Sequence, residues 1–414
     1  MRSHTGTTSR RTSSRIDWRR TPVGIGLPRP SEIQIVQVGT YPPTECGIAT
    51  HTANLQCALV DAGLRCGVIR VLDGDGESAP PPEELHAMWW DNSESGLDAA
   101  LDAADMSDVV VIQHEFGISS RPNGDDLVRF VERCSRPVIT VLHTLIEEPS
   151  RRQRAIVEAL AQRSSCLVVQ TQAARGRLLA THDVAEHKVV VVPHGASPNL
   201  TGPPLIEAAE PLMLTWGLLG PGKGIEHGIE ATALMRDQGL SVRYLVGGET
   251  HPNVRATEGE RYREGLQDLV RRRRVADLVD FDDRYRDWAS LNAQVRSATI
   301  VLVPYDSRDQ VTSGVLVEAL AAGKPVVSTA FPHAVELEAT GAVVTVDHES
   351  PRQIAAAVHE LLLDEERYQR MSIAARLEAS RYDWRSVGRQ FRTLIDEHRH
   401  APVGVSTLER AGRV

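Results

Sequence analysis

Residues 304–329 have the residue types and spacing needed to bind a diphosphate. An apolar strand gives way there to a polar loop, and a helix is expected to begin near Thr312 or Ser313, because either hydroxyl is a good N-cap. The first-turn amides of Ser313, Gly314 and Val315 would then lack backbone partners at the positive end of the helix dipole. This helix start therefore predicts an anionic ligand.

Two further side chains could contact the same ligand. Glu318 follows one turn later, where its carboxylate could accept two hydrogen bonds from a ribose diol. Lys223 stands in the loop GPGKG, where its ammonium could neutralise a phosphate, although the GxxxxGK[ST] spacing of a Walker loop is absent. The alternative is structural: Glu318 on the wet face of a capped core helix, and Lys223 as a solvated loop residue. The residues alone leave both interpretations open.

Polar residues also follow the expected strands of the N-terminal half. Gly47 lies where the first strand turns into its helix, His114 and Glu115 end a second strand, and His143 ends the next. His194 ends this half of the chain, where a hinge role fits equally well. A histidine at a strand end is often only a satisfied loop residue. Two such strand ends facing one cleft favour a ligand site instead.

These residues would be positioned by two similar halves. Apolar strands such as IQIVQVG and PVITVLH alternate with helical patterns, which is typical of a parallel sheet covered on both faces. The alternation stops at the Pro-rich segment SPNLTGPPLIEAAEP and restarts at LMLTWGLL. We therefore predict an α/β fold of two Rossmann-like, doubly wound parallel sheets facing across a cleft. The expected division is a disordered basic arm (1–30), an N-terminal domain (31–200), a linker (201–212), a C-terminal domain (213–380) and a final helix (381–400) packing back on the N-terminal domain.

Composition excludes several classes of protein. The 414 residues include 46 Lys plus Arg against 55 Asp plus Glu, and the formal net charge of -9 disfavours nucleic-acid binding. The five cysteines show no CxxC spacing, which argues against a zinc site or a disulfide scaffold and favours a reducing compartment. No apolar run approaches the ~18 residues that span a bilayer. We expect a cytoplasmic protein without a transmembrane segment, although peripheral membrane contact stays possible.

The C-terminal segments resemble the retaining glycosyltransferases of family 4, which have the GT-B fold. The signature of that family places Gly-Arg-Leu after a strand, then Lys-Gly, and later two glutamates with seven residues between them, followed by Ala, a small residue, Gly and Pro-Val-Val. This chain matches it at Gly217, Leu219, Lys223, Gly224, Glu318, Ala319, Gly323 and Pro325–Val327. The resemblance extends from about residue 33 to about residue 395.

The resemblance assigns roles to the residues above. His143 would lie beside the sugar being transferred, Lys223 would stabilise the leaving diphosphate, and Gln310 would contact the sugar. His114 and Glu115 would lie on the acceptor side. The implied donor-binding residues are Gly47, Lys223, Gln310, Thr312, Ser313, Gly314, Val315 and Glu318. This arrangement requires no metal ion and no cofactor beyond the nucleotide-sugar donor, a GDP- or UDP-hexose.

Two positions depart from the family. Leu218 stands where the family has a phosphate-binding arginine, and Gln310 replaces the first glutamate of the pair. Leu218 cannot bind phosphate, and Gln310 can hydrogen-bond a hydroxyl but carries no charge. Lys223 would then be the main side-chain cation for the leaving group.

The resulting hypothesis is a hexosyltransferase that moves a hexose from the nucleotide sugar to a carbohydrate, lipid or small-molecule acceptor with retention at the anomeric carbon. The alternatives are a nucleotide-sugar-binding protein with weakened catalysis, motivated by Leu218 and Gln310, and another GT-B enzyme such as a phosphorylase or a sugar-nucleotide epimerase.

Overall fold

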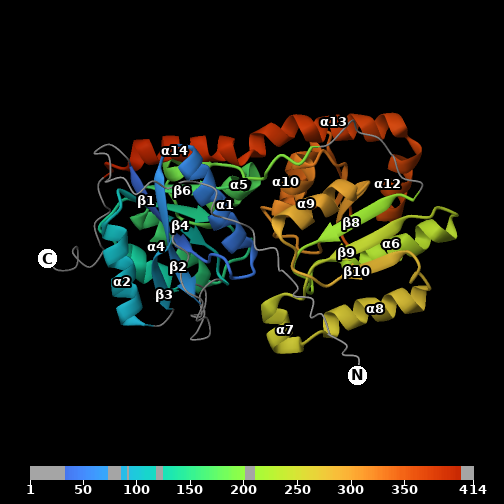
Figure 1. Cartoon of the computed structure of the whole chain (residues 1–414), viewed down its shortest axis with the longest axis horizontal. Helices are drawn as coiled ribbons and strands as arrows, with labels where there is room; N and C mark the ends of the chain where they lie inside the picture. The colour runs from blue at the N-terminus through green and yellow to red at the C-terminus, as the bar shows by residue number, and fades with distance from the viewer. Residues whose placement is uncertain (1–32, 73–84, 91–92, 118–124, 201–209, 402–414) are drawn as a thin grey trace, which may run out of the picture. The chain divides into compact units, whose positions relative to one another are not determined.

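The computed structural model describes residues 33–72, 85–90, 93–117, 125–200 and 210–401 (Figure 1). The predicted basic arm (1–30) and most of the predicted linker (201–212) lie outside these residues. Residues 33–414 form one compact unit by their contacts, so the predicted boundaries between domains remain a prediction.

The first sheet has seven strands, all parallel, in the spatial order β3-β2-β1-β4-β5-β6-β7. Its inner strands are buried along their length, as expected for a sheet covered on both faces. The edge strand β3 was not among the predicted strands. The strands are β1 (Gln34–Gly39), β2 (Arg65–Leu72), β3 (Leu85–Trp90), β4 (Val109–His114), β5 (Val138–Leu142), β6 (Cys166–Val169) and β7 (Val189–Val191).

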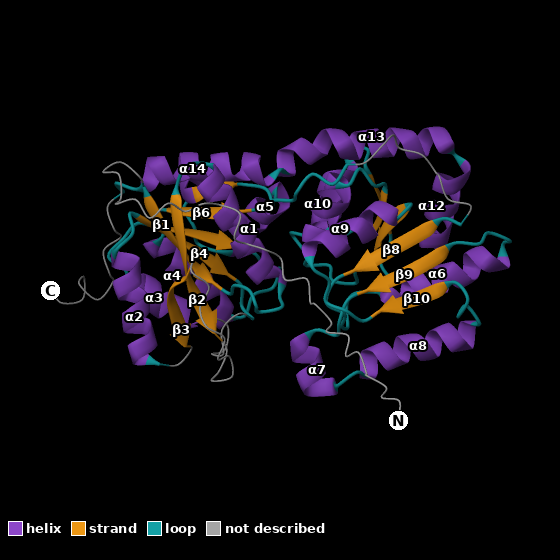
Figure 2. Cartoon of the chain, viewed as in Figure 1, coloured by secondary structure: helices purple, strands orange, loops and turns teal. Residues whose placement is uncertain are grey.

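The second sheet has six parallel strands in the order β10-β9-β8-β11-β12-β13. Together the two sheets, with their interleaved helices, make the GT-B architecture of two doubly wound units, as the sequence predicts (Figure 2). The strands are β8 (Leu212–Trp216), β9 (Arg243–Gly247), β10 (Val279–Asp282), β11 (Ile300–Val303), β12 (Val326–Thr329) and β13 (Val343–Val346).

Helices follow most of the strands and cover the faces of both sheets (Figure 2). The helices around the first sheet are α1 (Gly47–Asp61), α2 (Glu94–Asp105), α3 (Asp125–Arg133), α4 (Arg151–Arg163) and α5 (Gln172–Thr181), followed by a short 3-10 turn (Glu186–Lys188). Those that follow β8 are α6 (Ile225–Asp237), α7 (Pro252–Glu258), α8 (Arg261–Arg273), α9 (Trp288–Ser297), α10 (Gly314–Ala321), α11 (Pro332–Glu338), α12 (Pro351–Leu363), α13 (Glu365–Tyr382) and α14 (Trp384–His398).

The last helix returns to the first sheet. Helix α14 packs on α1, and Val387, Phe391 and Ile395 are buried with the strand residues Ile35 and Val111 in one apolar cluster. Gly388 makes this contact close, because a Cβ there would lie 2.4 Å from the carbonyl oxygen of Ala58. Within the described part of the chain, no helix is both long enough and apolar enough to cross a bilayer.

Strand order determines where a ligand can bind. In each sheet the order reverses beside the first strand, between β1 and β4 in one and between β8 and β11 in the other. Open parallel sheets bind ligands beyond the carboxyl ends of the strands at such a reversal. Gly47 follows β1 and His114 ends β4, while Lys223 and Ser313 follow β8 and β11, so these four predicted site residues lie at the two points.

Candidate active site

Two loops meet at the carboxyl edge of the second sheet. The loop after β8 contains Gly222 and Gly224, and the loop after β11 begins at Pro304. The amide of Asp306 donates to the carbonyl oxygen of Gly222 over 3.0 Å. Gly224 has a φ of 60°, and a Cβ there would lie 1.8 Å from the carbonyl oxygen of Pro304. Only glycine allows so close an approach, which places Lys223 beside the loop that leads into α10.

Lys223 is held by an aromatic ring. Its Nζ lies 4.2 Å from the centroid of the Tyr305 ring, and Tyr305 stacks on Phe331 with a centroid separation of 5.6 Å. Such a cation–π contact orients the ammonium while leaving its three N–H groups able to donate. Lys223 is only half-buried, so an anion can reach it.

Helix α10 begins as predicted, with Ser313 as N-cap whose hydroxyl accepts the amide hydrogen of Leu316. One detail differs from the prediction. The amide of Ser313 is not free, because it donates to Nδ1 of His333 over 2.9 Å. The amides of Gly314 and Val315 make no hydrogen bond within the described residues. The free donors at this helix end are therefore two of the three that the sequence predicts.

The loop before α10 carries two more predicted residues. The Gln310 amide nitrogen donates to the carbonyl oxygen of Thr312 over 2.8 Å, so this side chain folds back on its own loop. The hydroxyl of Thr312 is buried and has no hydrogen-bond partner among the described residues. An unsatisfied hydroxyl is costly to bury, and its place beside the helix start suits a ligand contact.

Glu318 lies in the second turn of α10 and is half-buried rather than fully solvated. Burial raises the pKa of its carboxyl group to about 7, and a hydrogen bond from the Trp216 indole N–H opposes part of that rise. Trp216 is the last residue of β8, so the two central strands bring the indole and the carboxylate together. A carboxylate in this position can accept hydrogen bonds from a ligand without facing bulk water.

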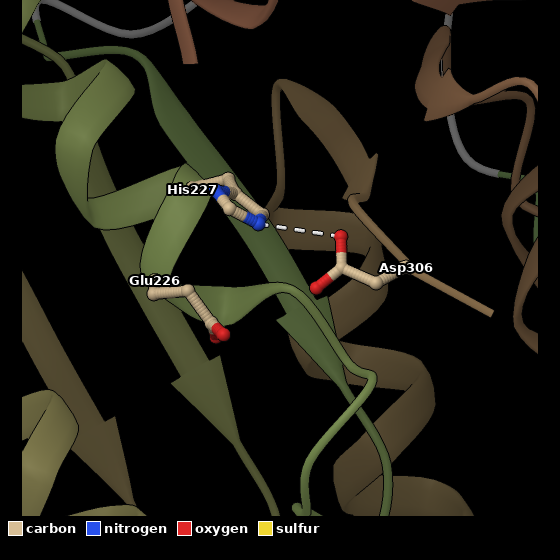
Figure 3. A group of neighbouring side chains, drawn as sticks. All are labelled: Glu226, His227 and Asp306. Carbon is tan, nitrogen blue, oxygen red and sulfur yellow. Dashed lines mark ion pairs between the residues drawn. The ribbon is translucent and has the colours of Figure 1, made fainter. Parts of the chain in front are cut away.

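A group of three possible cation ligands lies next to these loops (Figure 3). Glu226, His227 and Asp306 place one ligand atom each within 4.8 Å of one another, the one such group among the described residues. His227 Nε2 lies 3.2 Å from Asp306 Oδ1, while Glu226 accepts the Tyr262 hydroxyl hydrogen. Figure 3 shows His227 and Asp306 facing each other and Glu226 pointing to one side. Contacts within the protein account for this trio, which fastens α6 to the loop after β11.

Three imidazoles gather at the carboxyl edge of the first sheet. The His51 ring of α1 lies 4.7 Å from that of His143, after β5, and 5.1 Å from that of His194, after β7. Burial, together with the neighbouring His194 and His114, lowers the pKa of His143 to about 3, and burial lowers that of His194 to about 4. The group is therefore uncharged at neutral pH and can offer hydrogen bonds without charge.

The glycine at the start of α1 is open. Cys46 caps the helix, with Sγ accepting the amide hydrogen of Ala49. Gly47 follows, exposed, and a Cβ added to it would meet nothing within 4 Å. The first-turn backbone of α1 is thus accessible to a ligand, as the predicted role of Gly47 requires.

The two residues predicted on the acceptor side differ in exposure. His114 has no exposed surface, both of its ring nitrogens are buried without a partner among the described residues, and burial lowers its pKa to about 4. A direct contact with an acceptor would require His114 to be uncovered first. Glu115 is half-buried, and its carboxylate accepts hydrogen bonds from the Phe116 amide and the Thr144 hydroxyl. Burial raises the pKa of Glu115 despite these bonds.

Several contacts join the N-terminal residues to α10, to α11 and to the loop before α10. The hydroxyl of Thr171 donates to the carbonyl oxygen of Val311 over 2.7 Å. The carboxylate of Glu336 accepts amide hydrogens at the start of α5. A Cβ on Gly314 would lie 3.1 Å from the His194 ring, so that imidazole occupies the space which glycine leaves. A cavity of about 550 Å³ beside these contacts is lined by Arg177 and Arg308 among others, and by none of the predicted site residues.

Sequence reasoning missed several residues of this site. Tyr305, Trp216 and His333 contact Lys223, Glu318 and Ser313 respectively, but no local pattern indicates those pairs. Gln37 and Gln113 did carry a signal, because a glutamine inside an apolar strand run is unusual. Both prove fully buried in the first sheet.

Comparison with known proteins identifies the C-terminal part. The family described as glycosyl transferases group 1 matches residues 199–378, which include the donor-side residues described above. These residues form a glycosyl transferases group 1 domain.

Similar curated proteins are named as glycosyltransferases. The chain is 29% identical over 290 residues to the D-inositol 3-phosphate glycosyltransferase of Corynebacterium glutamicum, covering 63% of this chain and 66% of that protein. It is 25% identical over 318 residues to the protein of that name from Thermobispora bispora, covering 67% and 70%. The chain thus spans slightly less than two thirds of the Corynebacterium relative.

Solved structures share the fold. The Anabaena protein Alr3699/HepE in complex with UDP and glucose aligns with a TM-score of 0.70 at 17% identity, over 88% of this chain and 100% of that one. The E. coli trehalose-6-phosphate protein bound with UDP-2-fluoro glucose aligns with a TM-score of 0.64 at 16% identity, over 89% and 99%. At these identities the likeness shows the GT-B fold.

Proposed function

We propose that this chain is a retaining hexosyltransferase of glycosyltransferase family 4, which transfers a hexose from a GDP- or UDP-hexose to a carbohydrate, lipid or small-molecule acceptor. The observation that carries the proposal is the contact between the loop of Lys223 and the loop that leads into α10, at the carboxyl edge of the second sheet. Both belong to the segment that matches the glycosyl transferases group 1 model. Structural neighbours solved with UDP or UDP-sugars support a donor of this class.

The chemistry follows from the charges on that edge. Departure of the sugar leaves negative charge on the nucleoside diphosphate, and fixed donors aimed at that charge lower the barrier. The Lys223 ammonium and the free amides of Gly314 and Val315 supply such donors. Glu318 accepts hydrogen bonds from the ribose diol. The protein needs no strong base for this step, because it acts mainly on the leaving group.

The sugar lies between the two edges in this proposal. Gln310 contacts it from the loop before α10, and the neutral imidazole of His143 contacts it from the first sheet. Glu115, on the same edge as His143, faces the acceptor. Hydrogen bonds from uncharged groups hold sugar hydroxyls in place without competing with the cationic end of the site.

Leu218 and Gln310 favour a second candidate, a nucleotide-sugar-binding protein with little catalysis. Without the family's arginine and glutamate, binding could persist while transfer is lost. Turnover separates the two: the enzyme releases free diphosphate from its donor, whereas a binding protein shows saturable binding only.

The test has two stages. A thermal-shift screen of the full chain against UDP, GDP, ADP and their hexose conjugates identifies the base, since a ligand that binds the folded state raises Tm. Release of labelled nucleoside diphosphate is then measured with acceptors that include inositol phosphates, suggested by the names of the relatives. NMR of the product shows whether the donor's anomeric configuration is retained. Absence of binding by every nucleotide in the panel would overturn the proposal.

A further inference from the structure

Two glutamines form part of the core of the first sheet. Gln37 lies in β1 and Gln113 in β4, and each side chain is fully buried among apolar strands. Burying an amide is unfavourable unless its donors and acceptor are satisfied. Each glutamine must therefore have specific partners.

The strand register places the two glutamines in one row with His143. Gln37 pairs with Val111 of β4, and Gln113 pairs with Val141 of β5. Side chains alternate between the faces of a sheet, so a residue two positions further on leaves the same face. Gln113 is two residues beyond Val111, and His143 is two residues beyond Val141. All three side chains thus leave the same face, stepping diagonally toward the carboxyl edge.

Hydrogen bonds connect this row. Gln37 Nε2 donates to the carbonyl oxygen of Thr52 over 3.1 Å and lies 3.6 Å from Cys66 Sγ. Gln113 Nε2 donates to Gln37 Oε1 over 3.0 Å. The distance between Gln113 Oε1 and His143 Nε2 is 2.8 Å.

The direction of every bond is set at the Thr52 end. A backbone carbonyl can only accept, so the Gln37 amide must turn its nitrogen toward Thr52 and its oxygen toward Gln113. Gln113 must then turn its own nitrogen toward Gln37 and its oxygen toward His143. An oxygen facing the imidazole requires Nε2 to carry the hydrogen, so a neutral His143 keeps its lone pair on Nδ1.

We propose that Gln37 and Gln113 are positioning residues that fix His143 as the Nε2–H tautomer, so that Nδ1 presents a hydrogen-bond acceptor to a hydroxyl group of the bound hexose. The inference rests on the proposed function, in which His143 faces the sugar. Nδ1 makes no hydrogen bond within the described residues, and the side chain is only half-buried. The lowered pKa of His143, about 3, keeps the ring neutral and able to accept.

Gly39, the last residue of β1, leaves the space that this row needs. A Cβ there would lie 3.0 Å from Cβ of Gln113 and 3.4 Å from Oγ1 of Thr52. The absence of a side chain at Gly39 thus leaves room for the Gln113 side chain beside Thr52. Gly39→Ala should disturb the row without changing any of its polar groups.

The first measurement is the tautomer of His143 in the ligand-free full chain. Long-range ¹H–¹⁵N spectra of ¹⁵N-histidine-labelled protein distinguish a protonated Nε2 from a protonated Nδ1, and the His143 signals are assigned by their loss in His143→Asn. We expect the neutral Nε2–H form. Gln113→Met, which keeps the volume, should give a mixture of tautomers. Gln113→Glu should keep Nε2–H, because one carboxylate oxygen still accepts from the imidazole, although neither oxygen can donate to Gln37.

Gln56→Met is the matched control. Gln56 is another buried glutamine of the first sheet region, whose amide bonds the Tyr41 hydroxyl and the Cys66 carbonyl oxygen and does not touch His143. It should lose stability much as Gln113→Met does and leave the His143 spectrum unchanged. Should Gln113→Met fail to fold, the wild-type spectrum and Gln113→Glu decide the question. A wild-type His143 protonated on Nδ1, or a Gln113→Met protein with the wild-type tautomer, would overturn the inference.

Donor turnover supplies the second measurement. Relative to wild type, Gln113→Met should lower kcat/KM by about tenfold, the loss of one well-placed hydrogen bond, and Gln56→Met should not. Gln113→Glu should recover much of the activity near pH 8 and lose it at lower pH, because a carboxylate beside the imidazole favours its protonated form. If wild type itself turns over no donor, the proposed function fails while the tautomer result stands. A Gln113→Met protein with full turnover would overturn the positioning role.

Discussion

The carboxyl edges of the two sheets carry opposite kinds of polar group. On the first sheet the prominent groups are the imidazoles of His51, His143 and His194, all kept neutral by burial, which lowers their pKa values. On the second sheet they are the ammonium of Lys223, the free amides at the start of α10 and the carboxyl group of Glu318. Apart from the carboxyl group of Glu115, the first edge offers hydrogen bonds without charge, whereas the second offers charge and a helix dipole.

The difference suits two parts of one ligand. A diphosphate carries most of the charge of a nucleotide sugar and binds best to cations and helix N-termini. A hexose is neutral, and neutral donors and acceptors recognise its hydroxyls. Strand order also supports a ligand at both edges, because in each doubly wound sheet the order reverses there. The following predictions test whether charge is confined to the second edge.

Lys223 should give the largest effect. Lys223 is the chief side-chain cation on the leaving group in this proposal. Lys223→Ala should therefore lower kcat/KM by about 10²-fold, or ~2.7 kcal/mol of transition-state stabilisation, with little change in Tm. Steady-state kinetics and thermal unfolding measure both. Arg272→Ala, which removes an exposed cation from α8, is the control and should keep wild-type turnover. Full activity in Lys223→Ala would mean that a group other than Lys223 stabilises the leaving diphosphate.

His114 tests the neutrality of the first edge. The unfolded chain binds a proton on this residue near pH 6.5, whereas burial lowers the folded pKa to about 4. Stability due to this difference is present above pH 6.5 and is lost as pH falls toward 4, by ~2 kcal/mol at pH 5. His114→Leu should escape that loss, and because the ring is fully buried its turnover should change little.

Urea unfolding at pH 7.5 and pH 5.0 measures the effect as a difference between wild type and variant. His187→Leu, which removes a histidine at an exposed position before β7, is the control variant. Equal losses in wild type and His114→Leu would show that His114 is protonated inside the folded protein. A loss of turnover in His114→Leu would instead support the acceptor contact that the sequence predicts for His114.

Local patterns were enough to predict much of this architecture. The apolar strand runs, the N-cap at Ser313 and the helix start near Gly47 each depend on a few consecutive residues, and each is present in the structure. The edge strand β3 was missed, although it extends the parallel sheet beside β2.

Contacts between elements were not predictable in the same way. The amide of Ser313 donates its hydrogen to His333, which lies twenty residues further on in α11. A prediction made only from the residues at the helix start therefore gives three free amide donors where the structure leaves two. Lys223 over Tyr305 depends on the pairing of β8 with β11, and the His143 row depends on the exact register of three strands. Such pairs follow from topology, which sequence spacing alone does not specify.

Glu318 should show an intermediate effect. A carboxylate that accepts two bonds from a ribose diol should bind a 2′-deoxyribose donor about tenfold more weakly. Because the pKa of Glu318 in the free protein is about 7, the accepting form falls to about a tenth at pH 6. Donor affinity should therefore drop by up to tenfold between pH 8 and pH 6. Glu318→Gln should lose both the ribose preference and this pH dependence, and equal affinities of wild type for the two donors would contradict the role.

Leu218 should give the smallest effect and the finest test of the comparison. If the second edge is built for charge, a guanidinium added there by Leu218→Arg should tighten nucleoside diphosphate binding. Leu218 is half-buried, so the gain is that of a partly solvated ion pair, about two- to fivefold, and it should shrink as salt screens the charge.

Leu377→Arg, which adds the same charge on the exposed face of α13, controls for net charge and should leave affinity unchanged. Calorimetric titration with UDP and GDP at low and high salt measures the difference. Equal gains from both variants would mean that the whole protein's charge, and not a local phosphate site, determines the affinity.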